Sequence, residues 1–139
     1  MCIKELKSKT YLKILIVDDD PNIVDLEIAA LKQKNKHHEI LSAFSAKEAI
    51  EIAINNANSI DIILLDFQMP DFNGIDILRT LKLMSMTQNI PVVMISGSPD
   101  IKRNLSQSYV KPDEYMEKPF NILGFADKIE EIYNNFNSN

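Results

Sequence analysis

The sequence predicts an α/β domain with a parallel sheet, and three observations support this fold class. Three short apolar runs, rich in β-branched residues, occupy residues 14–17, 62–65 and 92–95. Strands that are covered on both faces have this appearance, which is typical of parallel sheets. Segments with helical apolar spacing lie between the runs, and this repeated order favours right-handed crossovers with helices on both faces. A chain of 139 residues is long enough for one such domain.

Five strands are expected in all, because two weaker candidates join the three strong runs. In order along the chain they are residues 14–17, 40–44, 62–65, 92–95 and 115–117. Five strands that alternate with five helices suit a doubly wound sheet of order 2-1-3-4-5, the flavodoxin-like arrangement. In such a sheet the functional site lies at the carboxyl ends of the strands, near the point where the strand order reverses.

Four of the helices have clear start signals or apolar stripes. The first follows Pro21, a favourable first-turn residue, with Asp20 as its N-cap, and the second follows a capping box from Ser45 to Glu48. The remaining helix, which is the fourth in chain order, is expected within residues 100–109, where the signal is weak because this stretch is polar. The expected stripes are Ile23, Leu26, Ile28, Ala30 and Leu31; Ala49, Ile50, Ala53 and Ile54; Ile75, Leu78, Leu81 and Met84; and Ile122, Phe125, Ile129, Ile132, Tyr133 and Phe136.

Composition excludes several classes of protein. The single cysteine, Cys2, rules out an intrachain disulfide, and no apolar run approaches the roughly 18 residues of a membrane span. The net charge of −5 disfavours a non-specific nucleic-acid binder. Residues 1–13 lack the apolar core of a signal peptide, so a cytoplasmic location is expected. The two histidines, His37 and His38, are expected in a solvated polar connection rather than in a metal or phosphorylation site.

Polar side chains follow four of the expected strands, at the point where each strand ends. Asp18 and Asp19 follow the first strand, Asp66 the third, Ser96 the fourth and Lys118 the fifth. The carboxyl ends of parallel strands meet at one edge of the sheet, so these groups are expected to converge there.

The chemistry of this set points to phosphoryl transfer. Carboxylates held close together repel one another unless a cation lies among them, and Mg²⁺ suits a few carboxylates plus water. A carboxylate beside Mg²⁺ can attack phosphorus and form an aspartyl phosphate. The phosphoryl oxygens then need donors, which the Ser96 hydroxyl and the Lys118 ammonium can supply.

Four motifs closely resemble the receiver domain of two-component response regulators. They are Val-Asp-Asp-Asp-Pro at residues 17–21, Leu-Asp-Phe-Gln-Met-Pro-Asp-Phe-Asn-Gly at 65–74, Ile-Ser-Gly at 95–97 and Glu-Lys-Pro-Phe at 117–120. The resemblance covers about residues 12–136. It leads us to expect an N-terminal extension at 1–11, a receiver domain at 12–136 and a frayed tail at 137–139.

The resemblance implies a role for each matching residue. Asp66 is the implied phosphoacceptor, while Ser96 and Lys118 contact the phosphoryl group. Ser96 and Tyr115 are the implied switch residues. The implied Mg²⁺ ligands are Asp18, Asp19, Asp66 and the backbone carbonyl of Gln68. A protein of this kind is a phosphorylation-dependent signalling switch and not an enzyme, since it takes part only in its own phosphoryl transfer and autodephosphorylation.

The resemblance also implies partners. The phosphoryl donor is a histidine kinase or a phosphotransfer protein, and the downstream partner is a protein target or an output domain outside this chain. A homodimer through the fourth helix, fifth strand and fifth helix is a further candidate, whereas direct contact with nucleic acid or membrane is not expected. The sequence leaves open whether the chain is a stand-alone receiver or part of a longer regulator or hybrid kinase.

Three other interpretations stay open at this stage. A Mg²⁺-dependent phosphohydrolase of the haloacid dehalogenase type would use an Asp-x-Asp pair, and Asp18 and Asp20 have that spacing. A flavodoxin would need a Ser/Thr/Gly-rich phosphate loop after the first strand, where three aspartates stand instead. A receiver-like interaction module that is never phosphorylated would keep the fold without the chemistry.

Overall fold

The computed structural model describes residues 11–69, 72–97, 110–118 and 121–138. Its main sheet has five parallel strands in the order β2-β1-β3-β6-β7, which confirms the predicted topology. The strands are β1 (Lys13–Val17), β2 (Glu39–Ala43), β3 (Ile62–Asp66), β6 (Val92–Ser96) and β7 (Glu114–Glu117). The helices are α2 (Pro21–Lys34), α3 (Ala46–Asn55), α4 (Gly74–Leu83) and α6 (Ile122–Asn137). The weak helix expected within 100–109 falls outside the described residues, and the three-part division of the chain stays a prediction.

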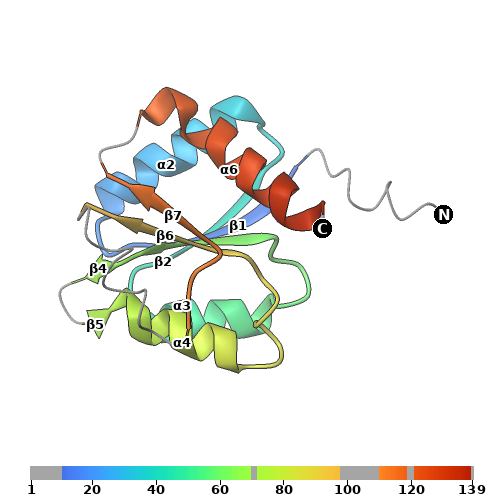
Figure 1. The fold of residues 1–139 in the computed structure, drawn as a ribbon. Coiled ribbons are helices and arrows are strands. Elements are labelled where there is room, and N and C mark those ends of the chain that lie inside the picture. Colours follow the sequence, from blue (N-terminus) through green and yellow to red (C-terminus); the bar gives the residue numbers. More distant parts are fainter. Residues whose placement is uncertain (1–10, 70–71, 98–109, 119–120, 139) are drawn as a thin grey trace.

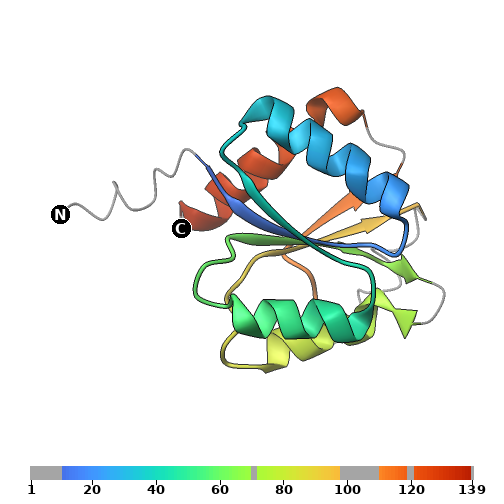
Figure 2. The same cartoon turned by 180° about the vertical axis from the view of Figure 1, so that it is seen from behind.

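The helices form two layers, with α2 and α6 on one face of the sheet and α3 and α4 on the other (Figures 1 and 2). Successive side chains of a strand point to opposite faces. In β1, Ile14 and Ile16 therefore pack under α2 and α6, while Leu15 and Val17 pack under α3 and α4. Both faces are covered, which explains why the strands read as continuous apolar runs.

Two predicted N-caps are present and fix where their helices begin. The Asp20 carboxylate accepts a hydrogen bond from the Asn22 backbone N–H at 2.9 Å, at the start of α2. The Ser45 hydroxyl accepts one from the Glu48 N–H at 3.2 Å, at the start of α3. The Glu48 carboxylate reaches back to the N–H of Phe44 at 2.7 Å, one residue before the N-cap. Each helix is thereby held at its first turn.

The apolar stripe predicted for α2 is wrong in part. Val24, Glu27 and Leu31 are the buried residues of this helix, whereas Leu26 is 56% exposed. Positions three and four apart share one face of a helix, and the cap at Asp20 sets the phase so that positions 24, 27 and 31 face the sheet. A glutamate thus occupies a core position that the sequence pattern assigned to its apolar neighbours.

The expectation of a solvated histidine pair is also wrong for one of its members. His38 is 1% exposed, and its Nδ1 accepts a hydrogen bond from the Leu12 N–H at 2.8 Å. Its Nε2 lies 3.1 Å from the Glu130 carboxylate. These contacts join the residue before β1 to α6, so His38 is a structural link, whereas His37 is exposed as expected.

A short antiparallel pair of strands follows β3 and was not predicted. It consists of β4 (Gln68–Met69) and β5 (Phe72–Asn73), and α4 begins directly after it. Strands of two residues carry no periodic signal that a sequence pattern could show.

Candidate functional site

Three carboxylates meet where β1 and β3 end. Asp18 follows β1 and Asp66 is the last residue of β3, so both are delivered to the same edge of the sheet. With Asp19 they form an acidic cluster, in which one carboxylate oxygen from each residue lies within 4.8 Å of the others. Asp18 and Asp66 are 3% and 7% exposed, and Asp19 is the most exposed of the three. The predicted convergence of these residues is thus present.

A lysine ammonium faces the acidic cluster from the end of β7. Lys118 Nζ lies 3.5 Å from Asp66 Oδ1 and 3.6 Å from Asp18 Oδ2. The backbone N–H of Lys118 donates to the Ser96 carbonyl at 2.7 Å, which continues the β6–β7 pairing past the end of the strand. Among the residues that the structure describes, the cluster therefore has three carboxylates and one nearby ammonium, which is an excess of negative charge.

Strand alternation divides the predicted site residues between the two faces of the sheet. Asp18, Asp66 and Lys118 continue the set of positions that face α2 and α6, such as Ile16, Leu64 and Met116. Ser96 and Tyr115 belong to the other set, which faces α3 and α4. The charged groups and the two predicted switch residues thus approach the sheet edge from different sides.

The two predicted switch residues lie on the adjacent strands β6 and β7, two register positions apart. Ser96 ends β6 and is fully buried, and Tyr115 of β7 pairs in register with Met94. Tyr115 is partly buried against the core under α3 and α4. Burial raises the pKa of its hydroxyl above the usual value of 10.0, and the Glu114 carboxylate raises this pKa further. Tyr115 is therefore a neutral ring at physiological pH.

The backbone after Asp66 is held close to the phosphoacceptor position. Gly74 donates its N–H to the Phe67 carbonyl at 2.9 Å, which closes the β4–β5 segment onto the end of β3. A Cβ atom at Gly74 would lie 2.7 Å from the Asp66 carbonyl oxygen, a distance that side chains do not tolerate. The absence of a side chain at Gly74 thus allows the start of α4 to approach the end of β3. Gln68 lies between these two elements in sequence.

A fourth carboxyl group, which the sequence analysis missed, belongs to Glu27 of α2. It is 2% exposed, and its Oε2 has no hydrogen-bond partner among the described residues. Burial raises the pKa of Glu27 from 4.5 to about 8; repulsion by Asp18 adds to the shift, Lys118 offsets part of it and Asp66 adds a smaller share. The sequence signal was a charged residue three after Val24 and four before Leu31, both core positions.

The residues of the acidic cluster fit a divalent metal ion. Oxygen donors are the ligands that Mg²⁺ and Ca²⁺ prefer, and Mg²⁺ is commonly held by few carboxylates together with water. The measured spacing of the three carboxylate oxygens permits one ion to contact them jointly, and the excess negative charge favours such an ion.

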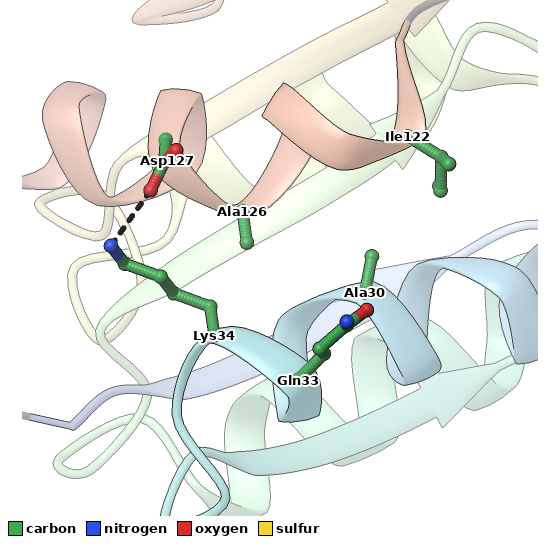
Figure 3. A pocket seen from close by; sticks show the side chains of 6 residues that line it. All are labelled: Ala30, Gln33, Lys34, Ile122, Ala126 and Asp127. Atoms are coloured by element: carbon green, nitrogen blue, oxygen red, sulfur yellow. Dashed lines mark ion pairs between the residues drawn. The ribbon is translucent and has the colours of Figure 1, made fainter.

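A pocket of about 230 Å³ lies between α2 and α6, away from these carboxylates (Figure 3). In Figure 3 the Lys34 side chain extends to Asp127 across the pocket, and the two form an ion pair of 2.9 Å. The pocket is lined by Ala30, Gln33, Lys34, Ile122, Ala126 and Asp127. It shares no residue with the acidic cluster.

Comparison with known proteins identifies the family. The family model described as the response regulator receiver domain matches residues 14–130. The chain belongs to this family. The receiver domain matches the solved structure of a receiver domain protein from Clostridium thermocellum with a TM-score of 0.76 at 30% identity, covering 91% of this chain and 98% of the other. A CheY-like receiver domain from Methanospirillum hungatei JF-1 has a TM-score of 0.78 at 24% identity, over 93% and 98% of the two chains, and this likeness shows the fold.

Several of the similar curated proteins are named as regulators of transcription. The receiver domain is 35% identical over 116 residues to the transcriptional regulatory protein YvrH of Bacillus subtilis (strain 168), covering 84% of this chain and 46% of the relative. It is 33% identical over 120 residues to the transcriptional regulatory protein CpxR of Escherichia coli (strain K12), covering 86% and 48%. The chain thus spans about half the length of these relatives. Among the described residues of the receiver domain, no helix combines the length and apolar character needed to cross a membrane.

Proposed function

We propose that Asp66 accepts a phosphoryl group from a histidine kinase or a phosphotransfer protein. The observation that carries this proposal is the position of Asp66 at the end of a buried strand, within 4.8 Å of two further carboxylates and 3.5 Å from the Lys118 ammonium. Membership of the response regulator receiver family supports the same reaction. Two-component signalling through this family depends on phosphorylation of the receiver, so Asp66 is the switch input.

The proposed metal ion is Mg²⁺, held by the acidic cluster and by the backbone carbonyl of Gln68. When bound, Mg²⁺ neutralises carboxylate charge and polarises phosphoryl oxygens. A carboxylate oxygen of Asp66 attacks the phosphorus atom, the phosphorus–nitrogen bond of the donor phosphohistidine breaks, and its electron pair stays on the imidazole nitrogen. Lys118 pairs with a phosphoryl oxygen, and the Ser96 hydroxyl donates a hydrogen bond to another.

The proposed response to phosphorylation is a coupled movement of Ser96 and Tyr115. An aspartyl phosphate carries nearly two negative charges and strong acceptor oxygens, so it attracts the Ser96 hydroxyl. Tyr115 lies on the same face of the sheet, one strand away, and can turn into space that Ser96 leaves. The surface that changes includes β7 and α6, where a downstream protein, an output domain or a second copy would dock.

Acetyl phosphate with Mg²⁺ tests the proposed phosphoacceptor. The wild-type chain should gain one phosphoryl group by mass, in an acid-stable and base-labile form, and Asp66→Asn should gain none. Asp20→Asn is the matched control, because Asn replaces Asp as an N-cap at little cost and keeps α2 in place.

Each outcome of that experiment separates two interpretations. Full labelling of Asp66→Asn would place the phosphoryl group elsewhere and end this proposal. A haloacid dehalogenase type of hydrolase would instead show repeated turnover of a phosphomonoester, and Asp20→Asn would abolish it. A single stoichiometric label that survives Asp20→Asn agrees with a receiver.

A further inference from the structure

Glu27 lies on the same side of the sheet as the charged groups of the proposed reaction. It projects from α2 between Val24 and Leu31, and both of these neighbours belong to the core under α2 and α6. Asp18, Asp66 and Lys118 reach the sheet edge from this side as well. A buried acid in such a place destabilises the folded protein, because a polar oxygen that has lost its hydration and accepts no hydrogen bond is unfavourable.

Lys118 makes two long ion pairs with the acidic cluster. Its Nζ stands 3.5 and 3.6 Å from the two aspartates, whereas a well-formed hydrogen bond from an ammonium to a carboxylate is about 2.7–2.9 Å. An ammonium has three hydrogens to donate. The Lys118 side chain is 27% exposed, so it has room to change its rotamer.

A cation in the acidic cluster changes the forces on Lys118. It neutralises Asp18 and Asp66, which are the two groups that now attract the ammonium, and it repels the ammonium directly. The ammonium then needs another acceptor within reach. Glu27 supplies a buried carboxyl group on the same face, with an oxygen that accepts no hydrogen bond from the described residues.

We propose that Glu27 is a positioning residue that receives the Lys118 ammonium when a divalent cation occupies the acidic cluster. Glu27 gives its proton to solvent when the pair forms, and the ammonium returns toward Asp66 when a phosphoryl group adds negative charge there. The raised pKa of Glu27 agrees with this, since burial and, to a smaller extent, repulsion by Asp18 and Asp66 favour the protonated carboxyl group. This inference rests on the metal site of the proposed function.

Calorimetric titration with Mg²⁺ tests the inference on four proteins: wild type, Glu27→Gln, Lys118→Met and the double variant. Glu27→Gln should weaken Mg²⁺ binding by about five-fold or more, because the ammonium has lost its alternative acceptor. Lys118→Met should bind Mg²⁺ more tightly than wild type. In the Lys118→Met background the Glu27→Gln change should have less than about a two-fold effect, since the group through which Glu27 acts is gone.

Asp25→Asn is the matched control, because Asp25 is an exposed carboxylate on the same helix, and it should leave Mg²⁺ affinity unchanged. Glu27→Leu serves if the glutamine variant fails to fold, because leucine suits the apolar neighbours of this position. It should show the same loss of Mg²⁺ affinity as Glu27→Gln. Carbon-13 NMR of the Glu27 carboxyl gives a second measurement: Mg²⁺ should shift it to the ionised position in wild type and less so in Lys118→Met.

Three results would overturn the inference. An equal loss of Mg²⁺ affinity in both backgrounds would mean that Glu27 acts on the ion directly and not through Lys118. An unchanged affinity in Glu27→Gln would make Glu27 a core residue alone. A wild-type protein that binds no Mg²⁺ would overturn this inference together with the proposed metal site, whereas labelling of Asp66 by a small phosphoryl donor reports on the phosphoacceptor separately.

Discussion

Lys118 stands at the centre of the charge balance at the sheet edge. Four carboxyl groups share this ammonium as a nearby positive charge. Asp18 and Asp66 lie within 3.6 Å of it, Asp19 belongs to the same acidic cluster, and Glu27 is buried on the same side of the sheet. Glu27 is the most buried acid of this set. Burial raises its pKa to about 8, and repulsion by Asp18 adds to the shift.

We expect the stability of the metal-free protein to fall with rising pH because of Glu27. The folded pKa of about 8 exceeds the ordinary value of 4.5, so between these values the folded chain binds the extra proton. The free energy of unfolding should then decrease across this window by up to about 1.4 kcal/mol per pH unit. Urea titrations from pH 5 to pH 8.5 in a chelating buffer measure the slope.

The Glu27→Gln variant should lack most of this slope, since an amide does not titrate. The Asp25→Asn variant should keep it, because Asp25 is exposed to solvent on the same helix. Identical slopes for wild type and Glu27→Gln would show that the pH dependence arises from another group.

The sequence could predict most of the residues at the sheet edge but not Glu27. Asp18, Asp66 and Lys118 were predictable because each directly follows or ends an apolar run, so the topology alone delivers them to one edge. The position of Glu27 depends on the rotational phase of α2. Leu26 and Glu27 are adjacent in sequence, and the composition of the helix gives no reason to bury the acid and expose the leucine.

At the scale of the elements, the segment between β3 and α4 contains the short β4–β5 pair, and Gly74 at its end lies beside the Asp66 carbonyl. The backbone that would present the Gln68 carbonyl to the metal lies in this segment. Its conformation therefore depends on a close approach that any side chain at position 74 disturbs.

We expect Gly74→Ala to destabilise the protein by about 1–3 kcal/mol, because the new methyl group meets backbone atoms that must shift. The variant should also be labelled more slowly by acetyl phosphate, since the displaced segment starts at Asp66. Urea unfolding and the time course of the mass gain measure the two effects. Gly124→Ala is the control, because a Cβ there meets nothing within 4 Å, and it should be neutral or slightly stabilising. Equal behaviour of the two variants would contradict the close approach at Gly74.

The main-sheet strands were predictable to within about a residue, and the reason is physical. The central strands β1, β3 and β6 are runs rich in β-branched residues and buried on both faces, which leaves little ambiguity about their type. The β4–β5 pair was not predictable, because two-residue strands have no period. The role of His38 was hidden as well, because its partners Leu12 and Glu130 are 26 and 92 residues away in sequence.

At the scale of the whole molecule, the five strands separate two core layers, one under α2 and α6 and one under α3 and α4. The charged groups Asp18, Asp66 and Lys118 come from the α2 and α6 side, and the proposed switch residues Ser96 and Tyr115 come from the α3 and α4 side. The aspartyl phosphate is the group that both sides can contact. Any change in shape must start at this edge.

We expect a phosphoryl mimic, beryllofluoride with Mg²⁺, to move Ser96 toward Asp66 and to change the environment of Tyr115. Fluorine NMR of protein labelled with 3-fluorotyrosine follows this change, with Tyr115→Phe used to assign the resonance among the four tyrosines. Tyr133 is the internal reference, because it is buried in the core on the opposite face of the sheet from Tyr115, and its resonance should shift less than that of Tyr115. A Tyr115 resonance that does not respond, with unchanged Ser96 and Tyr115 rotamers in crystal structures of the two states, would rule out this coupled movement.

The division of the sheet edge between two faces has a consequence for how such a protein can diverge. The sheet separates the two core layers. Substitutions in the apolar layer under α3 and α4 therefore change the packing around Ser96 and Tyr115 without contacting the acids proposed to hold the cation. Substitutions under α2 and α6 do the reverse, and Glu27 is an example. Cation affinity and the conformational response can therefore change independently in evolution, each through substitutions on its own face of the sheet, while the residues at the shared edge are retained.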